Sequence, residues 1–290
     1  MRQAEKVDLG SDDWTMEIRP YASAFHFPIK ELWEYRDLLF LFVRRDFKTM
    51  YKQTILGPAW ILLSPLLTTG MFSLIFGRIA GISTDGTPAF LFYMAGNILW
   101  NYFSSCLSAA SSTFIGNAGL FGKVYFPRLT TPISNVLTSI VTFLIQMVVV
   151  LIFLMFYIIN GSVMPNLQIC FTIPIILIQL GIMGMGIGII VSSLTTKYRD
   201  LSVLVTFGIQ LWMYITPVVY PLSQAGIGKL RYILLINPVT TPIELFRCGI
   251  LGKGEVEITY LIWSWIFTII VAVAGIMIFN KVERTFMDTV

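Results

Sequence analysis

Charged residues are scarce in this sequence of 290 residues. Asp, Glu, Lys and Arg together make up 12% of the chain, whereas soluble proteins carry about 25%. Hydrophobic residues make up 56%, and a globule of this size cannot hide so many apolar side chains from water. The composition therefore excludes a soluble enzyme, a secreted disulfide scaffold and a disordered linker, and it predicts a protein whose solvent is lipid.

Histidine and cysteine are also rare, and neither is placed for chemistry. The sole histidine, His26, has no Cys, Asp or Glu at ligand spacing. The cysteines are odd in number and set far apart among apolar residues, which favours buried packing over disulfides or a zinc site; they are Cys106, Cys170 and Cys248. No serine, histidine and aspartate set and no paired carboxylates share a predicted site. We therefore predict no catalytic residue and no metal ligand in this chain.

Long apolar runs are what the sequence has in abundance. A bilayer core of about 30 Å requires roughly 20 apolar residues in a helix. Six charge-free stretches meet this requirement, at residues 55–77, 89–115, 129–159, 167–196, 201–220 and 258–279. The predicted fold class is therefore an all-α membrane protein with six transmembrane helices, and residues 55–290 form its transmembrane domain.

The six stretches contain no Asp, Glu, Lys, Arg or His. Ion-coupled carriers, voltage sensors and intramembrane proteases place ionisable groups at membrane depth, so these classes are excluded. A phosphate-binding loop is not found either. Its best match, residues 116–123, has the wrong glycine spacing and is followed by Val124 where Ser or Thr is required. Any transport against a gradient must then draw its energy from a partner.

Basic residues are few, and their positions predict the orientation of the chain. Of the 20 Lys and Arg residues, 15 lie before the first stretch, in the second and fourth connections or after the last stretch, and among them Arg44, Arg45, Lys48 and Lys52 lie closest to the first stretch. By the positive-inside rule, both termini are predicted to be cytoplasmic. Residues 1–30 lack the apolar run of a signal peptide. Because the net charge is only +4 and no basic stripe is present, nucleic-acid binding is not expected.

Residues 29–47 predict an amphipathic helix at the cytoplasmic membrane surface, within an N-terminal arm of residues 1–54. Apolar side chains recur there at helical spacing, opposite a charged face, and Pro28 stands where a first helical residue is expected. The alternative is an ordinary surface helix packed on protein. The predicted interface residues are Leu32, Arg36, Leu39 and Phe42.

The segment between the last two stretches has two apolar runs that are too short to cross a membrane. Residues 230–236 and 239–251 are separated by Asn237-Pro238. Short broken runs predict re-entrant helices, and a broken backbone at membrane depth is tolerated only where protein or a wet cavity surrounds it. The alternative is a structured external loop that rests on the lipid.

Within the predicted spans, small residues are candidates for helix packing, and aromatic residues beside amide groups are candidates for lining a transport path. Gly184, Gly188 and Ser192 form a small-residue stripe that predicts close helix packing. An aromatic face beside amide groups suits a passing sugar, although aromatic belts and packing are the alternatives. The path candidates are Trp60, Tyr93, Trp100, Tyr102, Trp212 and Tyr214.

Four groups of residues together resemble the permease subunit in the type-2 class of ABC exporters. The first is Arg45-Asp46-Phe47, residues 51–60 and Ser64-Pro65-Leu66. The second is Gly116-Asn117, Leu120, Lys123 and Phe126-Pro127-Arg128. The third is Tyr198-Arg199-Asp200 with Thr216-Pro217-Val218, and the fourth is Asn237-Pro238 with Glu244, Phe246 and Arg247. The similarity covers residues 30–285.

Within that class the sequence is most similar to permeases that export lipid-linked polysaccharides such as O-antigen, capsule and teichoic acid. The resemblance implies a homodimer in the bacterial inner membrane, paired with two copies of a separate ABC ATPase subunit that binds ATP and Mg. It implies an undecaprenyl-linked glycan as the substrate and membrane lipid as the surroundings. It also implies two re-entrant helices between the fifth and sixth spans. No cofactor is expected in this chain itself.

The resemblance also assigns roles to particular residues. The predicted coupling residues, which would contact the ATPase subunit, are Asn117, Leu120, Lys123, Phe126, Arg128 and Arg199. Positive-inside anchoring is the alternative for the three basic residues among them. The external re-entrant segment is assigned Asn237, Pro238, Glu244 and Arg247. An exporter of lipid or drug from the same class, a passive channel and a membrane-embedded enzyme are the other functions that the sequence leaves open.

Overall fold

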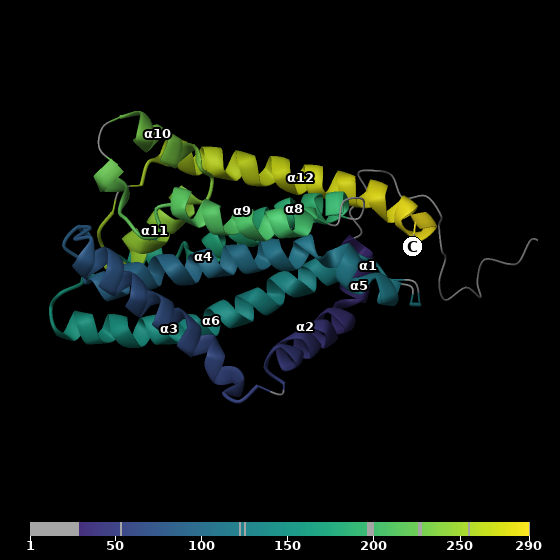
Figure 1. Cartoon of the computed structure of the whole chain (residues 1–290), viewed down its shortest axis with the longest axis horizontal. Coiled ribbons are helices and arrows are strands. Elements are labelled where there is room, and N and C mark those ends of the chain that lie inside the picture. Colours follow the sequence, from purple (N-terminus) through teal and green to yellow (C-terminus); the bar gives the residue numbers. More distant parts are fainter. Residues whose placement is uncertain are drawn as a thin grey trace, which may run out of the picture.

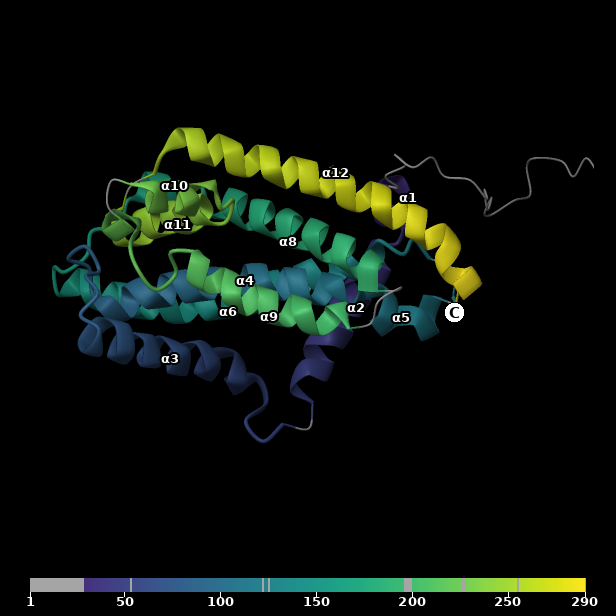
Figure 2. The same ribbon diagram turned by 45° about the horizontal axis from the view of Figure 1, so that its top comes forward.

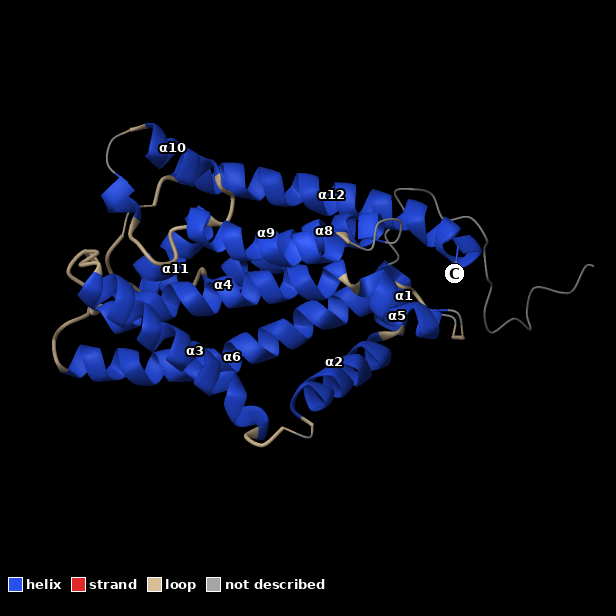
Figure 3. Ribbon diagram, in the orientation of Figure 1, coloured by secondary structure: helices blue, strands red, loops and turns tan. Residues whose placement is uncertain are grey.

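The structure is a computed structural model that describes residues 29–289 except 53, 122, 125, 196–199, 226–227 and 255 (Figure 1). This part of the chain is helical, without a strand (Figure 3). In chain order its elements are α1 (Ile29–Glu34), α2 (Arg36–Tyr51), η1 (Gly57–Ala59), α3 (Trp60–Phe72), η2 (Ser73–Ile79), α4 (Ala89–Ser111), α5 (Thr113–Phe121), α6 (Thr130–Ile159), α7 (Leu167–Cys170), α8 (Ile173–Thr195), α9 (Leu201–Ile215), η3 (Leu222–Ala225), α10 (Lys229–Ile236), α11 (Thr240–Leu251) and α12 (Ile258–Thr289).

The long helices lie side by side in an elongated bundle, which Figures 1 and 2 show from two directions. Helix α4 is at its centre, because it packs against α3, α6 and α8 and residues 91–100 are all buried. Helix α8 packs on its other side against α12. The most polar of the long helices is thus the one that the others surround.

Glycines on α8 allow this close packing. A Cβ atom added at Gly188 would lie 2.5 Å from the carbonyl oxygen of Leu107 on α4, and one added at Gly184 would lie 3.0 Å from that of Phe103. Ser192, the third residue of the predicted stripe, accepts a hydrogen bond at its Oγ from the backbone N–H of Phe114 at 3.2 Å. The predicted packing stripe is therefore confirmed, since any larger residue at Gly188 would push α4 and α8 apart.

Four helical segments in the described part of the chain are long and apolar enough to cross a membrane: Gly57–Ile79, Thr130–Ile159, Ile173–Thr195 and Ile258–Val282. The pair α10 and α11, bent by 91°, would add a fifth if it formed a single span. Helix α4 has the length of a span but carries two amides and four serines, and α9 has only 15 residues, about 22 Å. Four of the six predicted stretches therefore correspond to a candidate span by length and composition, and the α10–α11 pair lies outside the six stretches.

Two of the predicted stretches are interrupted where local chemistry breaks the helix. The stretch 167–196 is divided, because α7 ends at Cys170 and α8 begins at Ile173, immediately before Pro174. The stretch 201–220 ends as a helix at Ile215. Thr216 is extended, with φ −93° and ψ 138°, because the ring of the following proline disfavours the helical conformation at the residue before it.

Two further boundaries differ from the prediction. The stretch 89–115 contains the end of α4 at Ser111 and the start of α5 at Thr113, with Ser112 outside the helical region between them. The predicted helix 29–47 is two helices, since Tyr35, with φ −90° and ψ 18°, separates α1 from α2. Helix α2 then continues to Tyr51.

The bundle has two ends with different contents (Figure 1). We call one the α5 end, where α1, α5 and the C-terminal part of α12 lie. We call the other the α10–α11 end, where those two short helices lie with the connections between the long helices. Helix α2 runs obliquely across the outside of α6 from the α5 end toward the start of α3.

Candidate functional site

A cluster of buried aromatic side chains holds the α5 end together. The ring of Phe114 on α5 stacks on Phe279 of α12 with the centroids 4.9 Å apart. Phe126, which follows α5, packs edge-on against Phe42 of α2 at 5.7 Å and against Phe121 at 5.8 Å. These rings are all buried. One apolar cluster thus joins α2, α5, the following loop and α12.

Most of the predicted coupling residues lie on or beside this cluster. Phe126 is buried in it, Leu120 packs against it, and the Arg128 guanidinium lies over the Phe121 ring at 5.6 Å. Asn117 donates a hydrogen bond from Nδ2 to the carbonyl of Thr113 at 2.9 Å. Lys123 is exposed at the end of α5. The sixth predicted residue, Arg199, lies outside the described residues.

Some of the predicted interface residues contact protein, and others are exposed. Leu32 and Phe42 are buried in the same aromatic cluster, and Leu39 is half-buried. Arg36 is exposed and donates to the carbonyl oxygen of Trp33 at 3.3 Å. The face through Leu32 and Phe42 therefore packs on protein, as expected for the alternative of an ordinary surface helix. Other apolar side chains of α1 and α2 are exposed, among them Trp33, Phe40, Leu41 and Met50.

At the α10–α11 end, side chains satisfy the backbone break between the two short helices. The side chain of Asn237 accepts from Trp212 Nε1 at 3.1 Å and from the Val239 N–H at 3.2 Å, and it donates to Thr216 Oγ1 at 2.8 Å. The Ser264 hydroxyl on α12 donates to the carbonyl of Pro238 at 2.5 Å. The Asn237 side chain, held by Trp212 of α9, and Ser264 of α12 thus supply hydrogen bonds that the broken backbone lacks.

A second polar link reaches the same break from α8. Gln179 Nε2 donates to Ser264 Oγ at 2.7 Å, and both side chains are buried. Trp263 Nε1 donates to the carbonyl of Ile236 at 2.9 Å. The break at Asn237-Pro238 is therefore surrounded by protein, which is the environment that the sequence predicts for a broken helix at membrane depth.

Close to this break is a buried ion pair. Arg247 is 1% exposed, and its Nη1 contacts Glu244 Oε1 at 3.0 Å and the carbonyl oxygen of Pro217 at 2.6 Å. Its Nη2 donates to the carbonyl of Val218, and the guanidinium carbon lies 3.9 Å from the centroid of the Phe92 ring. Three partners and a ring face thus replace water around the two terminal nitrogens of this charge, while the buried Nε has no hydrogen-bond partner among the described residues.

Gly96 of α4 makes room for that guanidinium. A Cβ atom there would lie 2.5 Å from Arg247 Nη2 and 2.9 Å from the carbonyl oxygen of Val218. The connections at this end are also tied to one another, because Ser223 Oγ donates to Asp85 at 2.8 Å and Arg231 pairs with Glu257 at 2.9 Å. This end of the bundle is therefore cross-linked by polar contacts.

The aromatic path candidates differ in exposure. Tyr93, Trp100 and Tyr102 are at most 3% exposed and belong to the core of the subunit, where Tyr102 donates to the carbonyl of Leu177 at 2.9 Å. Their burial favours the packing alternative. Trp212 is half-buried, whereas Trp60 and Tyr214 are 43% and 58% exposed.

A cavity of about 330 Å³ lies between α3, α4 and α6, and its wall includes Trp60 and Tyr102. Its other lining is rich in neutral hydrogen-bonding groups, which are Asn101, Ser105, Thr138, Ser139, Thr142 and Gln146. The hydroxyls of α6 were missed as a group by the sequence analysis. Their signal is that Thr138, Thr142 and Gln146 recur every fourth residue in an otherwise apolar stretch.

The described part of the chain contains no group of three or more His, Cys, Asp or Glu side chains that could hold a metal ion. The α5 end offers an anchored surface with cations, and the cavity between α3, α4 and α6 offers neutral donors and acceptors.

Comparison with known proteins agrees with this arrangement. The family model described as ABC-2 type transporter matches residues 37–251. An O-antigen export system permease protein RfbA of Klebsiella pneumoniae is 34% identical over 256 residues, which are 87% of this chain and 94% of the relative. A permease of the same name from Myxococcus xanthus is 29% identical over 220 residues, which are 76% of this chain and 82% of that relative. The resemblance drawn from the four groups of residues is thereby confirmed, and the chain belongs to the ABC-2 type transporter family.

Proposed function

We propose that this chain is the transmembrane subunit of an ATP-driven ABC transporter that exports a lipid-linked polysaccharide of the O-antigen type across the inner membrane. The similarity to O-antigen export permeases over 87% of the chain carries the proposal. The charge-free helices agree with it, since a long glycan must slide past walls that hold no fixed ion.

In this proposal the bundle crosses the membrane six times. Helices α4 and α9 cross in addition to the four candidates, because they lie alongside the long helices in the bundle. Helices α10 and α11 re-enter the membrane from outside. The α5 end is cytoplasmic with both termini, since the basic residues Lys123, Arg128 and Lys281 belong to that end.

The working assembly is two copies of this chain with two copies of an ABC ATPase, which binds ATP and Mg and hydrolyses the nucleotide. The ATPase docks on the α5 end, at Lys123 and the adjoining faces of Asn117 and Leu120. The aromatic cluster makes this surface rigid, so that a movement of the ATPase is transmitted to α2 and α12 together. Arg199 belongs to the same predicted surface.

Within the transmembrane domain, the exposed Trp60 and the neutral groups around it contact the moving glycan. Hydroxyls and amides bind sugar hydroxyls without fixing them, and the indole ring offers a flat apolar face. The half-buried Trp212 and exposed Tyr214 are the other aromatic candidates for this path.

The test is affinity purification of the tagged chain from its native membranes, followed by ATPase assays and by glycan display in a deletion strain. We expect an ABC ATPase to co-purify and the deletion to abolish glycan display. Lys123→Glu should lower coupled ATPase activity and display by about tenfold or more, because it reverses an exposed charge at the docking surface. Lys229→Glu, an equal change at the other end of the bundle, is the control.

Three outcomes would contradict parts of the proposal. A chain that purifies alone from a strain with unaffected glycan display would favour a passive channel. Loss of drug or lipid export with normal glycan display would favour a different cargo. Equal activity in Lys123→Glu and the control would remove Lys123 from the docking surface.

A further inference from the structure

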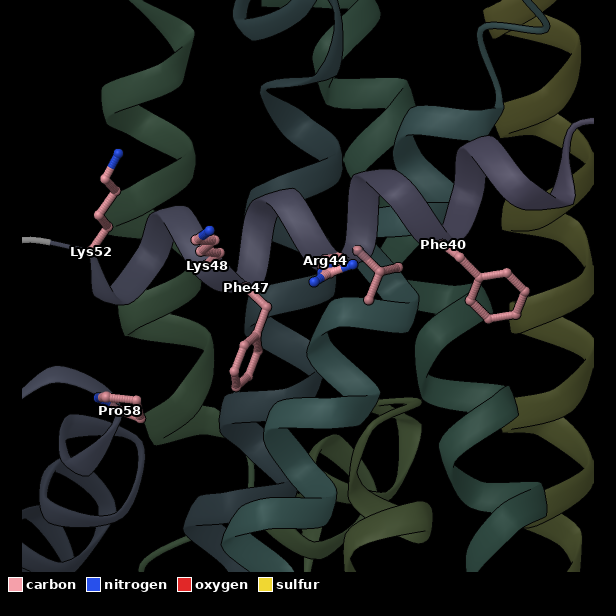
Figure 4. Close-up of a pocket in the computed structure, with 7 residues that line it drawn as sticks. Phe40, Arg44, Phe47, Lys48, Lys52 and Pro58 are labelled. Atoms are coloured by element: carbon pink, nitrogen blue, oxygen red, sulfur yellow. The ribbon is translucent and has the colours of Figure 1, made fainter.

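An open groove of about 670 Å³ lies between helix α2 and the turn that begins the first span. Figure 4 shows α2 crossing in front of the bundle, with Phe47 extending toward the side of Pro58 and Lys52 extending the opposite way. The groove therefore has aromatic rings on one side and basic groups on the other. Its labelled lining is Phe40, Arg44, Phe47, Lys48, Lys52 and Pro58.

The groove lies on the side of α2 that does not pack on the bundle. Phe40, Val43 and Phe47 are spaced three and four residues apart, so they share one helical face. Phe42, the buried anchor of α2, is on the opposite face against Phe126. Phe40 is 67% exposed. Helix α2 thus has one apolar face covered by protein and a second one left open.

Three cations border that open face. Arg44, Lys48 and Lys52 follow at intervals of four residues, and all three are exposed. The nearby Asp46 is engaged by Arg45, whose Nη2 lies 2.7 Å from its Oδ1. No acidic side chain pairs with Arg44, Lys48 or Lys52 among the residues that the structure places. The row spans about 12 Å, the rise of eight helical residues.

This combination selects one kind of ligand. A purely apolar chain would leave three cations unused, and a soluble anion would leave the aromatic side unused. A lipid with a phosphate head uses both, because phosphate oxygens accept from ammonium and guanidinium groups while the first carbons of the chain lie on the rings. Three cations exceed the single charge of a phosphodiester and can contact both phosphates of a diphosphate, which carries two charges when a lipid and a glycan are attached.

We propose that this groove holds the diphosphate head of the lipid-linked glycan before export, with Arg44, Lys48 and Lys52 on the phosphates and Phe40 and Phe47 against the lipid chain. The proposal rests on the proposed function, since it names the part of that substrate which this surface recognises. It places substrate entry at α2, beside the start of the first span and next to the anchored α5 end.

The test uses the complete transporter in nanodiscs of neutral phosphatidylcholine, titrated with undecaprenyl diphosphate and followed by native mass spectrometry. The variant Arg44→Gln/Lys48→Gln/Lys52→Gln should bind this lipid on the order of a hundredfold more weakly, because each cation near the phosphates contributes roughly a fivefold factor. The matched control Arg78→Gln/Lys229→Gln/Lys253→Gln removes the same charge from exposed sites elsewhere and should bind normally. Size-exclusion profiles confirm that both variants fold.

A second variant and two competitors separate the possible ligands. Phe40→Ser/Phe47→Ser should weaken lipid binding and leave the groove cations in place. Equal competition by phosphatidylglycerol would overturn the diphosphate assignment in favour of any anionic lipid, and equal competition by inorganic pyrophosphate would overturn the lipid. Unchanged affinity in the Gln variant would overturn the site. The proposed function fails separately, if the wild-type chain does not restore glycan display in the deletion strain.

Discussion

The two ends of the bundle satisfy their polar groups in opposite ways. At the α10–α11 end, the side chains of Asn237, Arg247 and Ser264 are buried. They donate hydrogen bonds to Thr216, Pro217 and Pro238 respectively. At the α5 end, aromatic rings fill the interior, and Lys123 and Lys281 are exposed. The first arrangement closes on itself, whereas the second leaves charges for a partner.

The difference follows from what each end must do in the proposed transporter. A broken helix at membrane depth has no water to satisfy it, so protein groups must do so, and the result is rigid. A docking end faces water and another protein, so its charges are free while the apolar cluster fixes their positions. Substitutions at the α10–α11 end should therefore mainly lower stability, and substitutions at the α5 end should mainly lower coupled ATPase activity.

The strongest test of this contrast is Arg247→Ala. It removes the Arg247 guanidinium from the buried Glu244 carboxylate and leaves the carbonyls of Pro217 and Val218 without that donor, so we expect a loss of about 3–5 kcal/mol in unfolding free energy. Thermal unfolding of the purified transporter measures it. Arg78→Ala, an exposed arginine in η2, is the control. Equal stability of the two variants would contradict the closed network.

A smaller loss of stability is expected from Asn237→Ala. The Trp212 indole and the Val239 N–H lose their buried acceptor, which should cost about 1–3 kcal/mol. The same unfolding measurement applies, with Asn160→Ala in an exposed turn as the control. If Asn237→Ala were as stable as that control, water would be reaching the break, and the closed character of this end would be refuted.

The smallest effect on stability is expected at the α5 end, from Phe126→Leu. It keeps an apolar side chain but loses ring contacts with Phe42 and Phe121, which amounts to about 1 kcal/mol. Coupled ATPase activity should fall more than unfolding temperature, because α2 and α5 lose their shared anchor. Phe156→Leu on the exposed face of α6 is the control. A variant with normal coupling would show that the cluster does not transmit movement.

Local patterns predicted some of these sites well. The stripe at Gly184 and Gly188 is where α4 approaches α8, and the break at Asn237-Pro238 separates two short helices as expected. Backbone rules explain both results, because a missing side chain permits close approach and a proline interrupts the helical hydrogen bonds. Five of the predicted coupling residues lie in the segment 117–128, whereas Arg199 lies outside the described residues, and their role in coupling stays a prediction.

Long-range packing could not be predicted in the same way. Tyr93, Trp100 and Tyr102 are path candidates by residue type; the surrounding helices bury all three, and Tyr102 also lines the cavity between α3, α4 and α6. Residues 29–47 are predicted as one helix at the membrane surface, with packing on protein as the alternative; the structure has two helices, 29–34 and 36–51, and Leu32 and Phe42 pack on protein. Residue type indicates what a side chain can contact, and only the neighbouring helices decide what it does contact.

The sequence by itself determined that the chain is a helical membrane protein of this family, and that its helices break at Asn237-Pro238. Those properties depend on composition and on neighbours along the chain, which the residues state directly. Only the tertiary structure decided that Arg247 is enclosed by residues from α4, α11 and the turn after α9, and that α2 leaves one basic and aromatic face open. Both depend on which helix faces meet, and side chains distant in sequence select that packing together.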